Sequence, residues 1–191
     1  MSLNADVEDL KPQAIELFKK WHRTGFISVG YWNYADRVII EIGSVNPDDN
    51  NSLKGATKSF IPVFQFLAYL QAEVNGNPGL MFPKFEDKGV SFFGGNNKPP
   101  IVSRIFNSKI YTDYRNNNAP DPFSRTFTCA HYEGEARDKG VIIPNYKAEI
   151  SKNTIKLALA DLAEMYQLLS MQVLAETVTD TLAELKSPHA L

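Results

Sequence analysis

Three side chains that could do chemistry stand two residues apart in the segment "RTFTCAHYEG". Cys129, His131 and Glu133 would share one face of a strand, because side chains alternate along a strand. Such a face could hold a metal ion, or pair a thiol with an imidazole. Zinc needs three or four ligands, and no Cys-x-x-Cys or His-x-x-x-His pattern supplies the others. An ordinary strand face is therefore favoured, and a small-molecule enzyme is the weaker alternative.

Other signatures of catalysis are missing from the sequence. The stretch "FFGGNN" contains Gly94 and Gly95, but neither a phosphate-binding loop nor a dinucleotide fingerprint follows, so it indicates a hairpin turn. No spacing pairs two carboxylates for acid–base work. We expect a protein that is not an enzyme, with no cofactor and no metal.

Basic and aromatic residues alternate in the segment "IVSRIFNSKIYTDYR". Arg104 and Phe106 share one parity along the strand, and Lys109 and Tyr111 share the other. Single-stranded nucleic acid is bound by such combinations, because aromatic rings stack on bases and cations meet phosphates. In the alternative interpretation, the aromatic residues fill the core and the basic residues are solvated edges.

The N-terminal half of the chain is expected to contain a helix, a strand hairpin, a third strand and a second helix. An apolar stripe predicts a helix over residues 10–23. Alternation over residues 26–32 and 37–45, around the turn "NYAD", predicts the hairpin. The segment "LKGATKSF", residues 53–60, indicates a strand. A helix then begins near Pro62 and ends at "NGNPG".

Residues 80–146 are expected to be rich in strands, joined by long polar connections. The candidate strands are "GVSFF", "IVSRIF", "KIYTDY", "RTFTCAHYEG" and "GVIIP". Residues 152–185 contain no Gly or Pro, and their apolar residues recur at three- and four-residue steps, which predicts one helix on the order of 50 Å long. Its second half would pack on another copy of the chain or fold back.

Composition limits the class of protein. The chain of 191 residues is 43% hydrophobic and 22% charged, as a globular protein is. The net charge of −2 provides no global attraction to nucleic acid, although a local basic face is compatible with it. A single cysteine and the absence of a secretory signal or a long apolar run indicate a cytoplasmic protein without a membrane partner.

Two segments with a Lys-Gly pair lead from a strand into a helix, namely "LKGATKSF" and "RDKGVIIPNYKAEISKNTIKLALADL". Both resemble the Lys-Gly strands of the Whirly and PC4-like proteins, and the order of elements is similar over residues 25–175. The resemblance implies antiparallel strands before a helix, twice in one chain, with helices packed together and sheets projecting outward. It also implies dimers or tetramers that bind single-stranded nucleic acid, with Lys54 and Lys139 facing it.

These observations predict an α+β fold with antiparallel sheets, each followed by a helix, an N-terminal helix and a long amphipathic C-terminal helix. The chain is expected to form a single domain over residues 1–191, with possible pseudo-halves at 25–78 and 80–186. It would form homo-oligomers through the C-terminal helix.

The leading functional hypothesis is the binding of single-stranded DNA or RNA on a basic and aromatic sheet face. The candidate residues are Tyr31, Trp32, Lys54, Lys58, Arg104, Phe106, Lys109, Tyr111 and Lys139. The alternative is a protein-interaction or assembly module that works through the C-terminal helix without nucleic acid.

Overall fold

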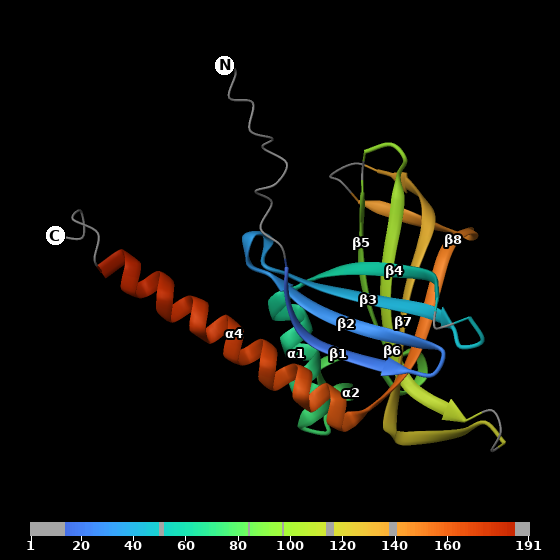
Figure 1. Ribbon diagram of the computed structural model, residues 1–191, viewed down its shortest axis with the longest axis horizontal. Coiled ribbons are helices and arrows are strands. Elements are labelled where there is room, and N and C mark those ends of the chain that lie inside the picture. Colours follow the sequence, from blue (N-terminus) through green and yellow to red (C-terminus); the bar gives the residue numbers. More distant parts are fainter. Residues whose placement is uncertain are drawn as a thin grey trace.

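The computed structural model describes residues 14–49, 52–83, 85–96, 98–113, 117–137 and 141–185. The chain is an α+β protein with two four-stranded antiparallel sheets (Figure 1). Sheet A has the strand order β1-β2-β3-β4, and sheet B has the order β5-β6-β7-β8. The strands of each sheet follow one another in the sequence, so each sheet is a simple meander.

Sheet A contains the predicted hairpin. Its strands are β1 (Ile15–His22), β2 (Gly25–Trp32), β3 (Arg37–Asn46) and β4 (Ser52–Pro62). The short 3-10 helix η2 (Asn33–Ala35) replaces a tight turn between β2 and β3, and Asp36 follows it in the left-handed region. Alternation of β-branched and polar residues explains β2 and β3, whose apolar side chains on one face are buried.

Three of the four strands of sheet B are longer than any strand of sheet A. The strands of sheet B are β5 (Val90–Asn96), β6 (Val102–Asp113), β7 (Ala119–Ala136) and β8 (Ile142–Ala158). Residues 102–106 and 109–113 of the two candidate strands "IVSRIF" and "KIYTDY" belong to the single strand β6. Strand β6 pairs continuously with β7 apart from one irregularity between Ile110 and Tyr111.

Helices follow each sheet. Helix α1 (Val63–Val74) continues directly from β4, as expected from Pro62, and α4 (Leu159–Leu185) continues directly from β8. Two short helices, α2 (Pro78–Met81) and α3 (Phe85–Lys88), connect α1 to sheet B. None of the described helices is both long and apolar enough to cross a membrane.

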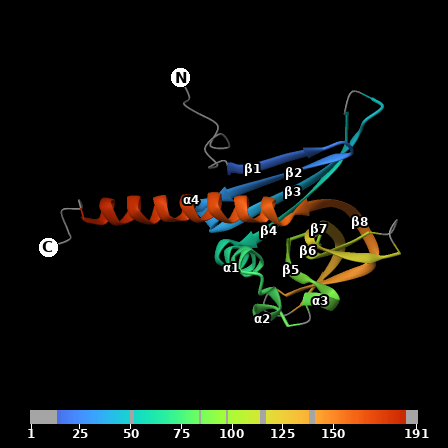
Figure 2. The same cartoon turned by 90° about the horizontal axis from the view of Figure 1, so that it is seen from below.

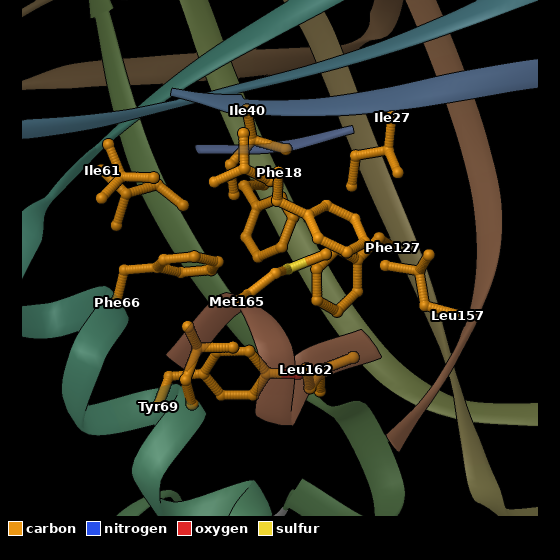
Figure 3. Close-up of a cluster of buried hydrophobic side chains, with 14 of the residues drawn as sticks. Phe18, Ile27, Ile40, Ile61, Phe66, Tyr69, Phe127, Leu157, Leu162 and Met165 are labelled. Atoms are coloured by element: carbon orange, nitrogen blue, oxygen red, sulfur yellow. The ribbon is translucent and has the colours of Figure 1, made fainter. Parts of the chain in front are cut away.

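The two sheets cross each other at a steep angle and share one core (Figure 1). Ile27 and Ile40 of sheet A face Phe127 and Leu157 of sheet B, and helices α1 and α4 close the core from the side (Figure 3). The ring of Phe127 meets that of Phe106 edge to face, with 4.9 Å between centroids.

The predicted N-terminal helix is wrong for the part of residues 10–23 that the structure describes. Residues Ile15–His22 form β1, which pairs with β2. A bulge between Glu16 and Phe18 adds one residue to the strand and changes which face the following side chains occupy. The apolar residues therefore lose their alternation of two, and the pattern resembles a helical stripe.

The predicted start of the C-terminal helix is also wrong. Residues 152–158 belong to β8, where Ile155 and Leu157 are buried opposite β7. The helix begins at Leu159, and the Asp161 carboxylate accepts hydrogen bonds from the Ala158 amide over 2.9 Å and from Lys20 Nζ over 2.7 Å. This carboxylate also favours the helix N-terminus electrostatically.

Helix α4 is about 40 Å long at 1.5 Å per residue. Its first half packs in the core through Leu162, Met165 and Leu169, whereas its second half projects beyond the sheets (Figures 1 and 2). The projecting half carries exposed apolar side chains at three- and four-residue steps. These are Met171, Leu174, Val178 and Leu182.

Candidate nucleic-acid interface

A groove of about 480 Å³ lies on the face of sheet B that points away from the core, and we call it the sheet B groove. All four strands of the sheet contribute to it. Its lining comprises Ser91, Phe93, Ile105, Asn107, Lys109, Tyr111, Thr112, Thr126, Thr128, Ala130, Tyr132, Tyr146, Lys152 and Thr154. This volume is within the range of known ligand sites.

Four aromatic rings line the groove. Phe93 and Tyr146 are 62% and 64% exposed, so their faces are open to a ligand. The rings of Tyr132 and Tyr146 meet edge to face with 5.3 Å between centroids. The ammonium group of Lys156 lies 3.9 Å from the centroid of the Tyr111 ring, a cation–π contact at the end of the groove.

Lys109 and Lys152 line the groove and no acidic side chain is among its described lining residues, although the Glu149 carboxylate beside it accepts a hydrogen bond from the Tyr132 hydroxyl over 3.4 Å. Lys152 has only a loose, exposed ion pair of 3.9 Å with Glu149. Lys156 pairs with Asp121 over 3.0 Å. Within the described part of the chain, Lys109 has no ion pair. Its charge is therefore available to an anion.

Hydrogen bonds within the groove hold its floor in place. Asn107 Nδ2 donates to the Val90 carbonyl over 3.0 Å and to Ser91 Oγ over 2.9 Å, which fastens β6 to β5. Thr128 and Thr154 hydroxyls are 3.1 Å apart across β7 and β8. These side chains are thus already oriented, and a ligand would meet a surface that needs little ordering.

One end of the same face is covered by Ile142. A Cβ atom on Gly95 would lie 2.7 Å from Ile142 Cδ1, and one on Gly134 would lie 2.7 Å from Ile142 Cγ2. Gly95 is two residues beyond Phe93, so both point to the same face of β5. The absence of side chains at the two glycines gives Ile142 its space.

The outer face of sheet A also carries aromatic and basic residues. Trp21 is 58% exposed, and its ring contacts that of Phe26 in a tilted arrangement with 4.9 Å between centroids. Two cations of this face are paired with carboxylates, Lys19 with Glu16 over 3.1 Å and Lys58 with Glu41 over 3.2 Å. Since paired cations attract phosphate less, the sheet B groove is the better candidate.

The predicted site residues fall into separate groups in the structure. Lys109 and Tyr111 lie together in the sheet B groove. Trp32 and Arg104 line a second cleft between the sheets. Lys54 and Lys58 are exposed on β4. Lys139 lies outside the described residues.

Two predicted stacking residues are buried instead. Phe106 has no exposed surface and Tyr31 is 4% exposed, so neither ring offers a face to a base, contrary to expectation. Burial, together with the nearby Glu176 carboxylate, raises the pKa of the Tyr31 hydroxyl to about 12. The positions of these two rings agree with the alternative interpretation, in which aromatic residues fill the core.

The Cys129, His131 and Glu133 face does not form a reactive cluster. Cys129 is buried, its Sγ lies 3.7 Å from the Ile40 carbonyl, and burial raises the pKa of its thiol to about 12. His131 Nε2 lies 2.6 Å from the Lys58 carbonyl, and burial lowers the pKa of the imidazole. Within the described residues, no group of three or more His, Cys, Asp or Glu side chains could hold a metal ion.

Several groove residues were missed by sequence reasoning. Phe93 and Tyr132 lie on strands that were expected, and Tyr146 lies two residues beyond the expected strand "GVIIP", but nothing in the sequence shows which face of these strands is concave. Lys152 was hidden because its segment was assigned to the helix. Alternation of Lys152 and Thr154 with the apolar Ile155 and Leu157 is the signal that could have revealed a strand there.

No model of a known protein family matches this chain, and no curated protein is similar to it.

Proposed function

We propose that this protein binds single-stranded DNA or RNA in the sheet B groove. The observation that carries the proposal is the combination of four aromatic rings with Lys109 and Lys152 in one groove whose described lining has no carboxylate. Bases stack on aromatic side chains with about 1–3 kcal/mol each, and lysines neutralise the phosphates between them. Sequence tolerance is expected, because every base has a stackable face.

The overall charge of −2 does not oppose this function. Electrostatic binding depends on the local field within about 10 Å at ordinary salt, which is the range of screening. Two lysines that each neutralise one phosphate give an expected slope of about −1.4 in a plot of log affinity against log salt concentration.

The resemblance to Whirly and PC4-like proteins remains part of the proposal. It is supported by the order of sheet A, α1, sheet B and α4, in which a four-stranded antiparallel sheet precedes a helix twice. Lys54 of the first Lys-Gly segment is exposed on β4, where a nucleic acid could reach it.

We further propose that α4 joins two copies of the chain. Met171, Leu174, Val178 and Leu182 are exposed along one side of a helix that projects from the body. Apolar residues at such steps form the seam between paired helices. Two copies of this stripe would cover each other.

The same stripe favours the alternative function, an assembly module without nucleic acid. The two functions differ in what a truncation after Leu169 would do. An assembly module would lose its partner while the sheets still fold, whereas nucleic-acid binding in the groove would persist at reduced apparent affinity because multivalency is lost.

A labelled single-stranded 30-mer of mixed sequence, titrated at low and moderate salt with fluorescence anisotropy, tests the groove directly. Replacing both lysines (Lys109→Gln, Lys152→Gln) should weaken binding and reduce the salt slope by about 1.4. The matched control replaces two exposed lysines elsewhere, Lys88→Gln and Lys98→Gln. Absence of binding at low salt, or equal losses in both variants, would refute the proposal.

A further inference from the structure

A second cleft of about 330 Å³ lies where the end of the β2–β3 hairpin and β4 meet β5 and β6. We call it the arginine cleft. It is lined by Trp32, Ala35, Arg37, Phe60, Gly94, Gly95 and Arg104. The cleft joins the two sheets, so residues far apart in sequence meet there.

Two arginines give the cleft its charge. Within the described part of the chain, neither Arg37 nor Arg104 has an ion pair, and no lining residue is acidic. The guanidinium carbon of Arg104 lies 5.2 Å from the centroid of the Phe60 ring, which holds the side chain by a cation–π contact. Its Nε is shielded from solvent and has no hydrogen-bond partner there. A buried donor without an acceptor is rare in folded proteins.

The shape of the cleft suits a flat group. Trp32 provides an aromatic ring, and the Arg104 guanidinium is itself a planar surface. Gly94 contributes only backbone, and a Cβ on it would meet nothing closer than the Phe60 carbonyl at 3.6 Å. A ligand can therefore approach the β5 backbone closely.

We propose that the arginine cleft binds one nucleotide, with its base stacked on Trp32 and its phosphate between Arg37 and Arg104. Arginine matches phosphate geometry through paired N–H donors. The site goes beyond the proposed function, because it is separate from the sheet B groove. Phe93 points into the groove, whereas Gly94 points to the opposite face of β5, toward Phe60. The nucleotide is either free or part of a strand that crosses the edge of β5.

The fluorescence of Trp32, observed in a Trp21→Phe background, tests the cleft with thymidine monophosphate as the probe. We expect quenching by the nucleotide, and about tenfold weaker binding of thymidine because it lacks the phosphate. Arg104→Gln and Arg37→Gln should each weaken nucleotide binding about tenfold. The matched control is Arg23→Gln, which is exposed in the β1–β2 turn. Since Arg37 is exposed, its variant remains informative even if Arg104→Gln unfolds.

Equal binding of thymidine and its monophosphate, or unchanged binding in both arginine variants, would overturn the proposal. The groove variant Lys109→Gln with Lys152→Gln should bind the mononucleotide like the wild type. The experiments therefore distinguish a wrong proposal for the groove from a wrong proposal for the cleft.

Oligonucleotides of two lengths distinguish the sources of the nucleotide. If the arginine variants weaken binding of a 20-mer but not of a 5-mer, the cleft holds part of the strand that occupies the groove. If both oligonucleotides bind normally while mononucleotide binding is lost, the ligand is a free nucleotide.

Discussion

Arg125 on β7 donates two hydrogen bonds to Glu73 on α1, from Nε over 2.8 Å and from Nη2 over 2.7 Å. Both side chains are almost completely buried. The Tyr69 hydroxyl also donates to Glu73 over 3.0 Å and lies 2.6 Å from Ser108 Oγ. This network fastens helix α1, which follows sheet A, to strands β6 and β7 of sheet B.

Breaking this ion pair should destabilise the fold strongly. Glu73→Ala would leave the Arg125 guanidinium buried without its partner, at a cost of about 3–5 kcal/mol in the free energy of unfolding. Urea unfolding followed by circular dichroism measures the loss. The double variant with Arg125→Ala should lose less than the sum of the single variants. A loss below about 1 kcal/mol for Glu73→Ala would contradict the role of the pair.

Stability should fall on mild acidification because of His131. Burial, and to a smaller extent the charge of Arg104, lowers the pKa of its imidazole below the ordinary 6.5. Because the pKa of His131 is lower in the folded state than in the unfolded state, the contribution of this side chain to the free energy of unfolding is complete above pH 6.5. It is lost as the pH falls below that value. Burial lowers the pKa of His22 in the same direction.

The melting temperature measured between pH 7.5 and 5.5 tests this dependence. Above pH 5.5 most carboxylates stay ionised, so the histidines dominate the change. The plot of melting temperature against pH should be flatter in the variant His131→Asn, and flatter still when His22→Asn is added. A curve of unchanged steepness in the double variant would show that other groups titrate.

Removal of exposed aromatic rings should show which of the two sheets binds the oligonucleotide. Phe93→Ala and Tyr146→Ala should each reduce the affinity for a single-stranded oligonucleotide by about 1–3 kcal/mol, because each loses a stacking surface. Trp21→Ala is the comparison, since Trp21 is similarly exposed on sheet A. Anisotropy titrations that show the larger loss for Trp21→Ala would place the binding face on sheet A instead.

Two glycines in strands should respond differently to alanine. A Cβ on Gly95 would collide with the Val102 carbonyl oxygen, whereas a Cβ on Gly55 would meet nothing within 4 Å. Gly95→Ala should therefore destabilise the protein by about 1–3 kcal/mol through overpacking. Gly55→Ala should be neutral or stabilising by up to about 1 kcal/mol. Chemical denaturation of both variants checks the contrast, which fails if their stabilities agree.

Charges on the exposed stripe of α4 should disrupt oligomers. Leu174→Glu with Val178→Glu would place two like charges in the seam between copies, so a lower mass is expected in analytical ultracentrifugation. Ala183→Glu is the control, because residue 183 lies on the other side of the helix from the stripe. A wild-type protein that sediments as a monomer at high concentration would exclude this interface.

Local patterns were sufficient for much of the fold. Alternation identified β2 and β3, and Pro62 marked the start of α1. The prediction failed where one local pattern imitates another. The bulge at Glu16 broke the alternation of β1, and the lack of Gly or Pro concealed the passage from β8 to α4. Both elements are fixed by pairing with a neighbouring strand, which a local pattern does not contain.

Strand β6 shows which part of the site the sequence predicts and which part it does not. The sequence by itself determined that Arg104 and Phe106 share one face and that Lys109 and Tyr111 share the other, because side chains alternate along any strand. Only the tertiary structure decided which face is buried. Sheet A packs on the side of Phe106, so that ring fills the core and Arg104 enters the cleft between the sheets, while Lys109 and Tyr111 remain in the groove.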